Sequence, residues 1–119
     1  MEEIKLGVVE LRFADIIWQH EPLPSGELVK LCEQKLIWKK STTYTILKKL
    51  SERGLFQNQD GIVTSLISKQ EFNSLQSEKF VDEAFDGSLP AFLAAFSARK
   101  KLSDEEIEEL QQLINQSRR

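Results

Sequence analysis

The chain has 119 residues, of which 40% are hydrophobic and 29% are charged, and its formal net charge is −3. A chain of this length and composition forms one globular domain, or one domain with a helical appendage. It contains no apolar run of the roughly 18 to 20 residues that a transmembrane helix needs, and residues 1–5 lack the features of a signal peptide. We therefore expect a cytoplasmic protein without membrane insertion.

Positive and negative charges are concentrated in different parts of the chain. Residues 35–53 contain six basic residues and one acidic residue, which gives a net charge of +5. Residues 71–119 contain six basic and ten acidic residues, which gives a net charge of −4. Such asymmetry indicates that only one part of the chain contacts an anionic partner.

Few side chains in the sequence suit catalysis or metal binding. Cys32 is the single cysteine, and its apolar neighbours predict a buried small hydrophobic residue, not a reactive thiol. His20 is the single histidine and has no second ligand at metal-binding spacing. The acidic residues within 104–109 lie at a predicted helix start, where the helix dipole accounts for them. We therefore predict that the protein is not an enzyme and that it needs neither a metal nor another cofactor.

Hydrophobic periodicity predicts three helices in the first half of the chain. Apolar residues recur at nearly helical spacing over residues 6–18, and the prolines that follow leave a short extended segment. Ser25 is a favourable N-cap for a second helix that ends near residue 36. Ser41 is the expected N-cap of a third helix, which ends where Gly54 can adopt the left-handed conformation.

A β-hairpin is predicted directly after the third helix. Residues 55–59 and 62–67 have the composition of short strands, and Asp60-Gly61 is a favourable two-residue turn. The order of a helix, a short strand, two helices and a hairpin is that of a winged helix-turn-helix. Because residues 57–60 include no cation, we expect the hairpin to be mainly structural.

The third predicted helix has the surface of a DNA-recognition helix. Its predicted buried stripe consists of Thr43, Ile46, Leu47 and Leu50. The opposite face presents hydroxyl groups that can contact base edges in the major groove, and lysines that can bind phosphates. The residues predicted to bind DNA are Lys39, Lys40, Ser41, Thr42, Tyr44, Thr45, Lys48, Lys49 and Arg53.

Two other interpretations of this basic segment stay open. In the first, the lysines form an ordinary solvated helix face, as most runs of charge do. In the second, the fold is a winged-helix module that binds another protein and not DNA, which the acidic tip of the hairpin favours. A gel shift against genomic DNA fragments separates the second interpretation from DNA binding.

The second half of the chain is predicted to be helical. Ser68 caps a helix that extends to residue 86, Pro90 opens a short apolar helix, and residues 103–106 form a capping box for a last helix. These helices carry more large apolar residues than they can bury among themselves, which favours a twofold homodimer over packing against the first half. The predicted dimerisation residues are Phe72, Leu75, Val81, Phe85, Leu89, Phe92, Leu93, Phe96, Ile107, Leu110, Leu113 and Ile114.

Together these patterns predict a mainly α protein with a small β-hairpin. Residues 1–70 are the expected winged helix-turn-helix DNA-binding domain, and residues 71–119 are the expected helical dimerisation domain. A twofold dimer of this kind suits a palindromic DNA site, because two recognition helices would enter successive major grooves.

Several motifs of the chain occur in the same order in one known family. Residues 15–18 (Asp-Ile-Ile-Trp) end the first helix with an apolar pair and a tryptophan. Residues 41–55 form a threonine-rich helix that ends in a basic residue, a glycine and a leucine. Residues 85–88 (Phe-Asp-Gly-Ser) and 102–110 belong to the predicted dimerisation region. In order and spacing, over almost the whole chain, these motifs resemble the penicillinase and methicillin-resistance repressors (the BlaI/MecI family), which also includes copper-responsive (CopY-type) repressors.

The resemblance implies a transcriptional repressor that binds a palindromic operator in double-stranded DNA as a homodimer and that functions in antibiotic resistance. It also implies that a membrane-bound, antibiotic-sensing zinc metalloprotease relieves repression by cutting the short apolar helix, here between Ala95 and Phe96. The chain departs from the family at Leu11, at Thr43 and at Ala95, where a tryptophan, an aliphatic residue and an asparagine are typical. It also lacks a basic wing and the C-terminal cysteines of the copper-responsive branch, so copper sensing is not expected.

Overall fold

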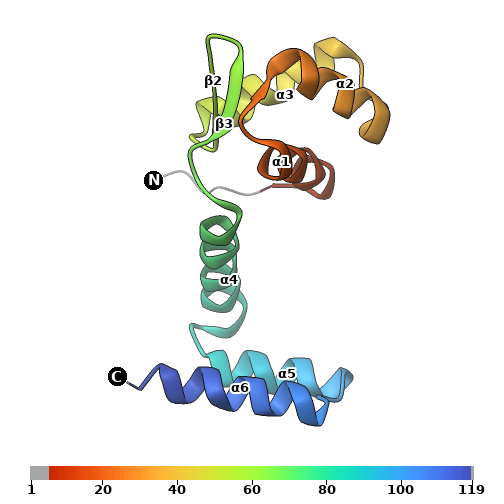
Figure 1. Cartoon of the computed structure of the whole chain (residues 1–119). Helices are drawn as coiled ribbons and strands as arrows, with labels where there is room; N and C mark the ends of the chain where they lie inside the picture. Colours follow the sequence, from red (N-terminus) through yellow and green to blue (C-terminus); the bar gives the residue numbers. More distant parts are fainter. Residues whose placement is uncertain (1–5, 119) are drawn as a thin grey trace. The chain divides into compact units, whose positions relative to one another are not determined.

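The computed structural model describes residues 6–118, which divide into two compact units at the bond between Gln76 and Ser77. The first unit begins with α1 (Val8–His20), β1 (Leu23–Pro24), α2 (Ser25–Leu36) and α3 (Lys40–Glu52). It continues with the hairpin of β2 (Phe56–Gln59) and β3 (Ile62–Ser65) (Figure 1). Helix α4 (Lys69–Phe85) crosses the boundary, and α5 (Leu89–Arg99) and α6 (Asp104–Gln116) complete the second unit. The predicted fold class, mainly α with a small β-hairpin, is confirmed.

The three strands form one antiparallel sheet in the order β1-β3-β2. Asp60 and Gly61 have φ values of 53° and 81°, as a two-residue turn between twisted strands requires. The hairpin prediction is therefore confirmed, with β2 and β3 shorter than expected. Glu21 lies two residues before β1, and its carboxylate accepts hydrogen bonds of 2.8 Å from the backbone N–H and the hydroxyl of Ser65. These bonds tie the chain before β1 to the end of β3.

Helix boundaries depart from the predicted caps at two places. Helix α2 begins at Ser25 with Pro24 as its N-cap, and α3 begins at Lys40 with Lys39 as its N-cap. The predicted N-caps at Ser25 and Ser41 are therefore wrong. The N-cap residue with extended backbone is Pro24 in α2 and Lys39 in α3, so each serine lies inside the first turn of its helix. By contrast, Gly54 follows Arg53, the C-cap residue of α3, and has φ +86°, as predicted.

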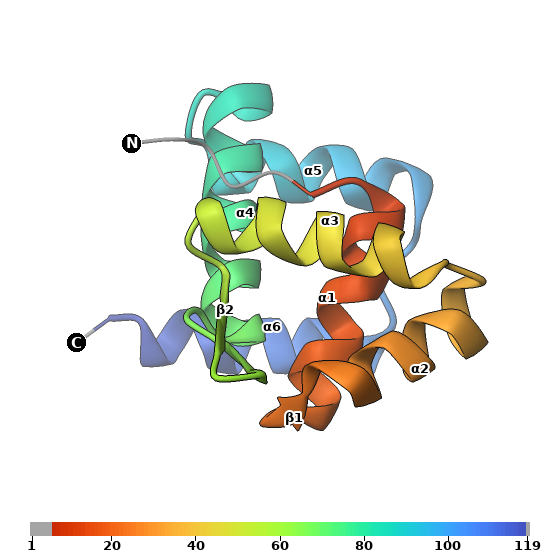
Figure 2. The same cartoon turned by 90° about the horizontal axis from the view of Figure 1, so that it is seen from above.

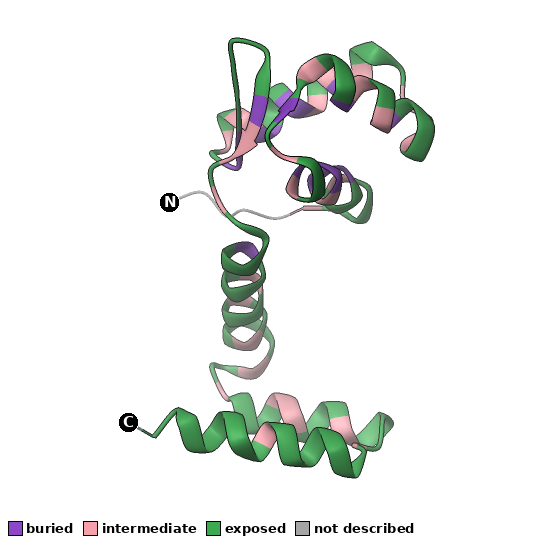
Figure 3. Cartoon of the chain, viewed as in Figure 1, coloured by how far each residue is buried: buried purple, intermediate pink, exposed green. Residues whose placement is uncertain are grey.

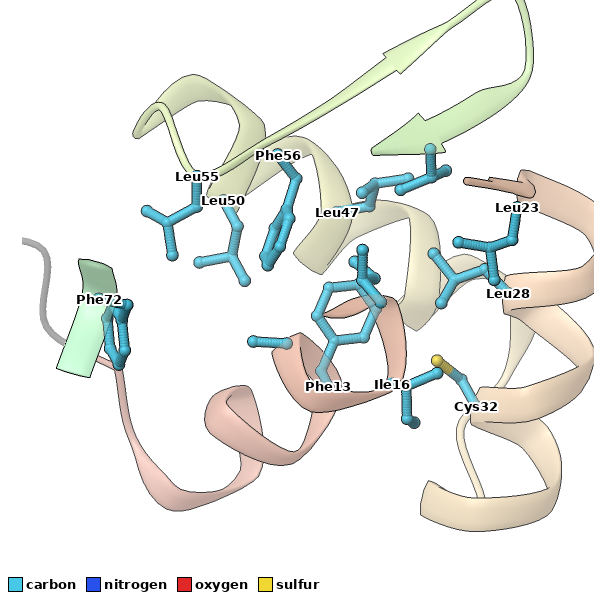
Figure 4. Close-up of a cluster of buried hydrophobic side chains, with 13 residues drawn as sticks. Phe13, Ile16, Leu23, Leu28, Cys32, Leu47, Leu50, Leu55, Phe56 and Phe72 are labelled. Atoms are coloured by element: carbon cyan, nitrogen blue, oxygen red, sulfur yellow. The ribbon is translucent and has the colours of Figure 1, made fainter. Parts of the chain in front are cut away.

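The core of the first unit lies among α1, α2, α3 and the sheet (Figures 2 and 4). The Phe13 ring stacks on Trp38 at a centroid distance of 5.5 Å and meets Phe56 edge-on at 6.4 Å. The Trp18 indole N–H donates to the carbonyl of Ile67 at 3.0 Å, which anchors the segment after the hairpin. Cys32 is completely buried in this core, as predicted.

Phe72 requires a correction. It was expected in the dimerisation region, but it is only 4% exposed and lies in the core cluster of the first unit, with its ring 5.6 Å from that of Trp18. The first turns of α4 complete this core, because Trp18 would otherwise present one face to water. For the same reason the first compact unit extends to Gln76, beyond the expected domain end at residue 70.

The second unit has a different character. None of its described residues, 77–118, is buried, whereas the first unit contains a continuous buried cluster (Figure 3). Four phenylalanine rings make contacts at centroid distances of 5.6 to 6.2 Å in the series Phe80, Phe85, Phe92 and Phe96. The predicted capping box is confirmed: Ser103 Oγ accepts from the Glu106 N–H at 3.1 Å, and Glu106 Oε1 accepts from the Ser103 N–H at 3.0 Å.

Within residues 6–118, no helix has both the length and the apolar content that a membrane-spanning helix requires.

Candidate nucleic-acid interface

Helix α3 packs on the core through one face and exposes the other. Thr43, Leu47 and Leu50 are buried, and Ile46 is half-buried against the core, so the predicted inward stripe is confirmed. Of the nine residues predicted to bind DNA, the exposed ones are Lys39, Lys40, Ser41, Thr45, Lys48 and Lys49. The other three, which are half-buried, are Thr42, Tyr44 and Arg53.

The N-terminus of α3 has no side-chain cap among the described residues. The first N–H groups of a helix lack intrahelical acceptors and carry the positive end of the helix dipole. Lys39 is the N-cap residue and Lys40 the first helical residue, and both side chains are exposed. Two cations and an uncapped helix end thus lie together, which is the arrangement that favours a phosphate group.

Thr45 and Tyr44 are held in different ways. The Thr45 hydroxyl donates to the Ser41 carbonyl at 2.8 Å, so its polar atom is turned to the helix backbone while the residue stays exposed. The Tyr44 hydroxyl donates to Ser25 Oγ at 3.1 Å, and the ring packs against the core. Tyr44 therefore links α3 to the start of α2, and its hydroxyl is already engaged within the protein.

Lys49 forms an ion pair that links α3 to α1. Its Nζ lies 3.2 Å from Glu10 Oε2, and Glu10 Oε1 accepts from the Gly7 N–H at 3.2 Å. The hydrogen bond from Gly7 lowers the pKa of Glu10, and the charges of Lys49 and Arg53 lower this pKa further. Glu10 thus offsets part of the positive charge at the C-terminal end of α3. Helical phase alone did not identify this partner, because Glu10 is far from Lys49 in the chain.

Cys32 and Thr43 form a buried contact behind the exposed face of α3. Burial raises the pKa of the Cys32 thiol, and a hydrogen bond with Thr43 acts in the opposite direction. The thiol is therefore neutral and unreactive at physiological pH, in line with the structural role predicted for it.

The hairpin offers polar groups without cations. Gln57, Asn58, Gln59 and Asp60 are all exposed, and the Gln57 amide donates to Thr64 Oγ1 at 3.1 Å across the strands. The hairpin tip therefore offers no basic group to an anion, whereas α3 and the residue before it carry exposed lysines.

Comparison with known proteins gives the family. The sequence profile of the penicillinase repressor family matches residues 6–116. The chain is 26% identical over 116 residues to the penicillinase repressor of Bacillus licheniformis, covering 94% of this chain and 91% of that one. It is 22% identical to the methicillin resistance regulatory protein MecI of Staphylococcus aureus, covering 93% of this chain and 94% of that one.

A solved structure supports the fold. The solution structure of the monomeric form of Bacillus licheniformis BlaI, in complex with the blaP half-operator, superposes with a TM-score of 0.51 at 20% identity. The match covers 59% of this chain and 90% of that chain. The resemblance inferred from the sequence motifs is thereby confirmed. The chain belongs to the penicillinase repressor family, whose members are transcriptional repressors and not enzymes.

Proposed function

We propose that this protein represses transcription by binding a palindromic operator in double-stranded DNA as a homodimer. The observation that carries this proposal is the exposed surface of Lys39, Lys40, Ser41, Thr45 and Lys48 along α3 and its N-cap, together with an N-terminus of α3 that has no side-chain cap. Two features of duplex DNA match this surface: phosphates match the cations, and base edges match the hydroxyl and methyl groups. The operator contact of the BlaI structure, which has the same fold, supports the choice of ligand.

The predicted DNA-binding residues divide into three groups. Lys39, Lys40 and Lys48 would bind phosphates and supply most of the salt-dependent affinity. Ser41, Thr42 and Thr45 lie on the N-terminal half of α3, which enters the major groove in helix-turn-helix proteins, and would contact base edges. Tyr44, Lys49 and Arg53 form the third group, which would position α3. Tyr44 is hydrogen-bonded to Ser25 of α2, and Lys49 and Arg53 interact electrostatically with Glu10 of α1.

Dimerisation is proposed to occur through the second unit. Helices α5 and α6 line a groove of about 250 Å³ whose walls are mainly apolar; its residues include Phe92, Phe96, Leu110 and Leu113. Outside this groove, Leu89 is 61% exposed and Ile114 is 53% exposed. A unit of residues 77–118 in which no residue is buried has too little core of its own, and a second copy would cover the exposed apolar side chains. A twofold dimer also presents two copies of α3, as a palindromic operator requires.

Relief of repression is proposed to follow the family's route, in which an activated, membrane-bound sensor metalloprotease cuts the dimerisation region. The corresponding bond joins Ala95 and Phe96 on α5, and both residues are exposed. A protease binds its substrate in an extended form, so α5 must open locally before cleavage. In a single chain, opening costs little free energy because α5 has 11 residues and no buried side chain; in the proposed dimer the contacts with the second copy add to this cost. Incubation with the activated sensor tests this step; an uncut chain after full activation contradicts it.

Selection from a random-sequence DNA pool tests the proposed function directly. The full chain is expected to retain a palindromic duplex, to shift it as a dimer in a gel, and to lose roughly a thousandfold or more in affinity between about 50 and 200 mM salt if the dimer makes six or more phosphate contacts. Retention of no sequence above background, together with capture of a protein partner, would support the alternative of a winged-helix protein-interaction module.

A further inference from the structure

The turn between α2 and α3 contains a residue whose backbone and side chain are both unusual. Ile37 has φ 57° and ψ 38°, in the left-handed region, and its side chain is 83% exposed. β-branched residues avoid this region because Cβ comes too close to the following carbonyl oxygen. Glycine and asparagine adopt it at much lower cost in free energy, and they are the usual residues where a helix ends in this way.

The fold explains the backbone conformation of Ile37 but not its side chain. The N–H groups of Ile37 and Trp38 both turn back to the carbonyl of Cys32, which ends α2 and directs the chain into α3. A glycine or an asparagine would form the same turn. The Ile37 side chain is not among the core residues of the first unit or the side chains packed against them. Burial within the described unit therefore does not offset the strain of its backbone.

The surroundings of Ile37 indicate what its side chain contacts. Lys35 lies in the last turn of α2, and Lys39 and Lys40 begin α3; all three are exposed. The sequence contains no acidic residue between Glu33 and Glu52. An anion that also offers apolar groups would match exposed lysines beside an exposed apolar side chain. A DNA duplex has both, since thymine methyl and deoxyribose groups lie next to its phosphates.

We propose that Ile37 is a DNA-contacting residue, whose side chain packs against apolar groups of the operator beside the phosphates held by Lys39 and Lys40. This inference rests on the proposed DNA-binding function. It assigns a role to a residue outside the recognition helix, and it explains why a strained turn contains isoleucine: the contact exists only in the complex, where it offsets a cost that is present in the free protein.

The test compares two asparagine variants of the full chain. Ile37→Asn relieves the backbone strain and removes the apolar contact. Val8→Asn is the matched control, because Val8 is 80% exposed and begins α1, outside the proposed interface. Melting temperature is measured for each chain. Affinity is measured at several salt concentrations on the duplex that the wild-type chain selects from a random-sequence pool, and on the same duplex with uracil in place of thymine.

For Ile37→Asn we expect a melting temperature higher by about 4 °C and an affinity lower by about tenfold. The slope of affinity against salt should stay unchanged, because no charge is removed. Val8→Asn should bind as the wild type does. A wild-type preference for thymine over uracil that disappears in Ile37→Asn assigns the thymine methyl as the contact. Equal wild-type binding of both duplexes, with Ile37→Asn still weaker, assigns the deoxyribose.

Three results would overturn the inference. Unchanged affinity in Ile37→Asn would show that the side chain does not touch DNA, while the proposed DNA-binding function would stand. A lower melting temperature would show that the turn is not strained. A changed salt slope would show that the substitution displaces the lysines instead of removing a contact. If the wild-type chain selects no duplex at all, the proposed function itself fails.

Discussion

At the scale of single residues, Lys48 and Lys49 differ although they are neighbours on α3. The structure gives Lys49 an acidic partner on α1, Glu10, at 3.2 Å, and both Lys48 and Lys49 are exposed. A lysine whose positive charge is partly neutralised by a carboxylate contributes less free energy to the binding of a phosphate. The two positions therefore separate the phosphate-binding role from the positioning role within one helix turn.

We predict that Lys48→Ala weakens DNA binding across all sequences and, because the proposed dimer loses one phosphate contact in each subunit, reduces the salt slope by about 2. Lys49→Ala should cause a smaller loss of affinity, because Glu10 already neutralises part of the charge of Lys49. Fluorescence anisotropy on one selected duplex and one unrelated duplex, at several salt concentrations, measures both quantities. Equal losses in the two variants would contradict the distinction.

A second residue-scale prediction concerns the pH dependence of stability. The pKa of Glu10 is lower in the folded chain than its ordinary value of 4.5, chiefly through the Gly7 N–H and then through Lys49. A group with a depressed folded pKa stabilises the fold above its unfolded pKa and loses this contribution as the pH falls through the folded pKa. Glu10→Gln should therefore lower the free energy of unfolding by about 0.5 kcal/mol at pH 7.

This difference should decrease as the pH drops below 4.5 and vanish once Glu10 is protonated in both states. Urea unfolding of the wild type, Glu10→Gln, Lys49→Gln and the double variant at neutral and acidic pH gives the coupling between the two side chains. A difference that grows on acidification would have the wrong sign and would reject this account.

At the scale of secondary-structure elements, the interactions at the N-terminus of α6 contribute much of the stability of this helix. Its N-terminus has three acidic residues in the first turn and the reciprocal hydrogen bonds of Ser103 and Glu106. None of its described residues is buried, so local interactions contribute a large share of its stability. Caps matter less for α2 and α3, whose buried residues tie them to the core.

We predict that Ser103→Ala destabilises the second unit by about 1 kcal/mol, because the Glu106 N–H loses its acceptor. Ser97→Ala is the matched control, since the Ser97 hydroxyl only donates to the Ala94 carbonyl within α5. Helical circular dichroism during thermal unfolding reports both variants. If Ser97→Ala destabilises the second unit as much as Ser103→Ala does, the loss of the capping box is not the cause of the destabilisation.

At the scale of the whole molecule, exposed apolar side chains on α6 lead to the last prediction. Ile107 and Ile114 lie one heptad apart on the same helix face, are 40% and 53% exposed, and are not among the residues that line the groove with α5. In the proposed dimer a second copy covers this face. Gln112 lies on the opposite side of α6 and is exposed.

Ile114→Glu should therefore shift the chain from dimer to monomer and weaken operator binding by at least tenfold, because two half-sites are no longer bound together. Gln112→Glu adds the same charge and should remain dimeric. Sedimentation equilibrium gives the state of each variant. A wild-type chain that is monomeric at high concentration would remove the proposed dimer altogether.

The sequence by itself determined the features that depend on neighbours a few residues away. The inward stripe of α3, the Asp60-Gly61 turn, the left-handed Gly54 and the capping box of α6 follow from helical period, backbone preference and local hydrogen bonding. The order of the elements indicated a winged helix-turn-helix, the order and spacing of the sequence motifs indicated the family, and the basic character of the segment around α3 was evident from charge alone.

Only the tertiary structure decided which distant residues meet. It placed Phe72 in the first core, paired Lys49 with Glu10, engaged the Tyr44 hydroxyl with Ser25, and put Ile37 in a left-handed turn. The physical reason is that packing and ion pairing act between segments whose separation in the chain leaves no periodic signal. Local patterns specify which face of a helix is apolar, whereas the choice of partner for each side chain depends on how the helices pack against one another.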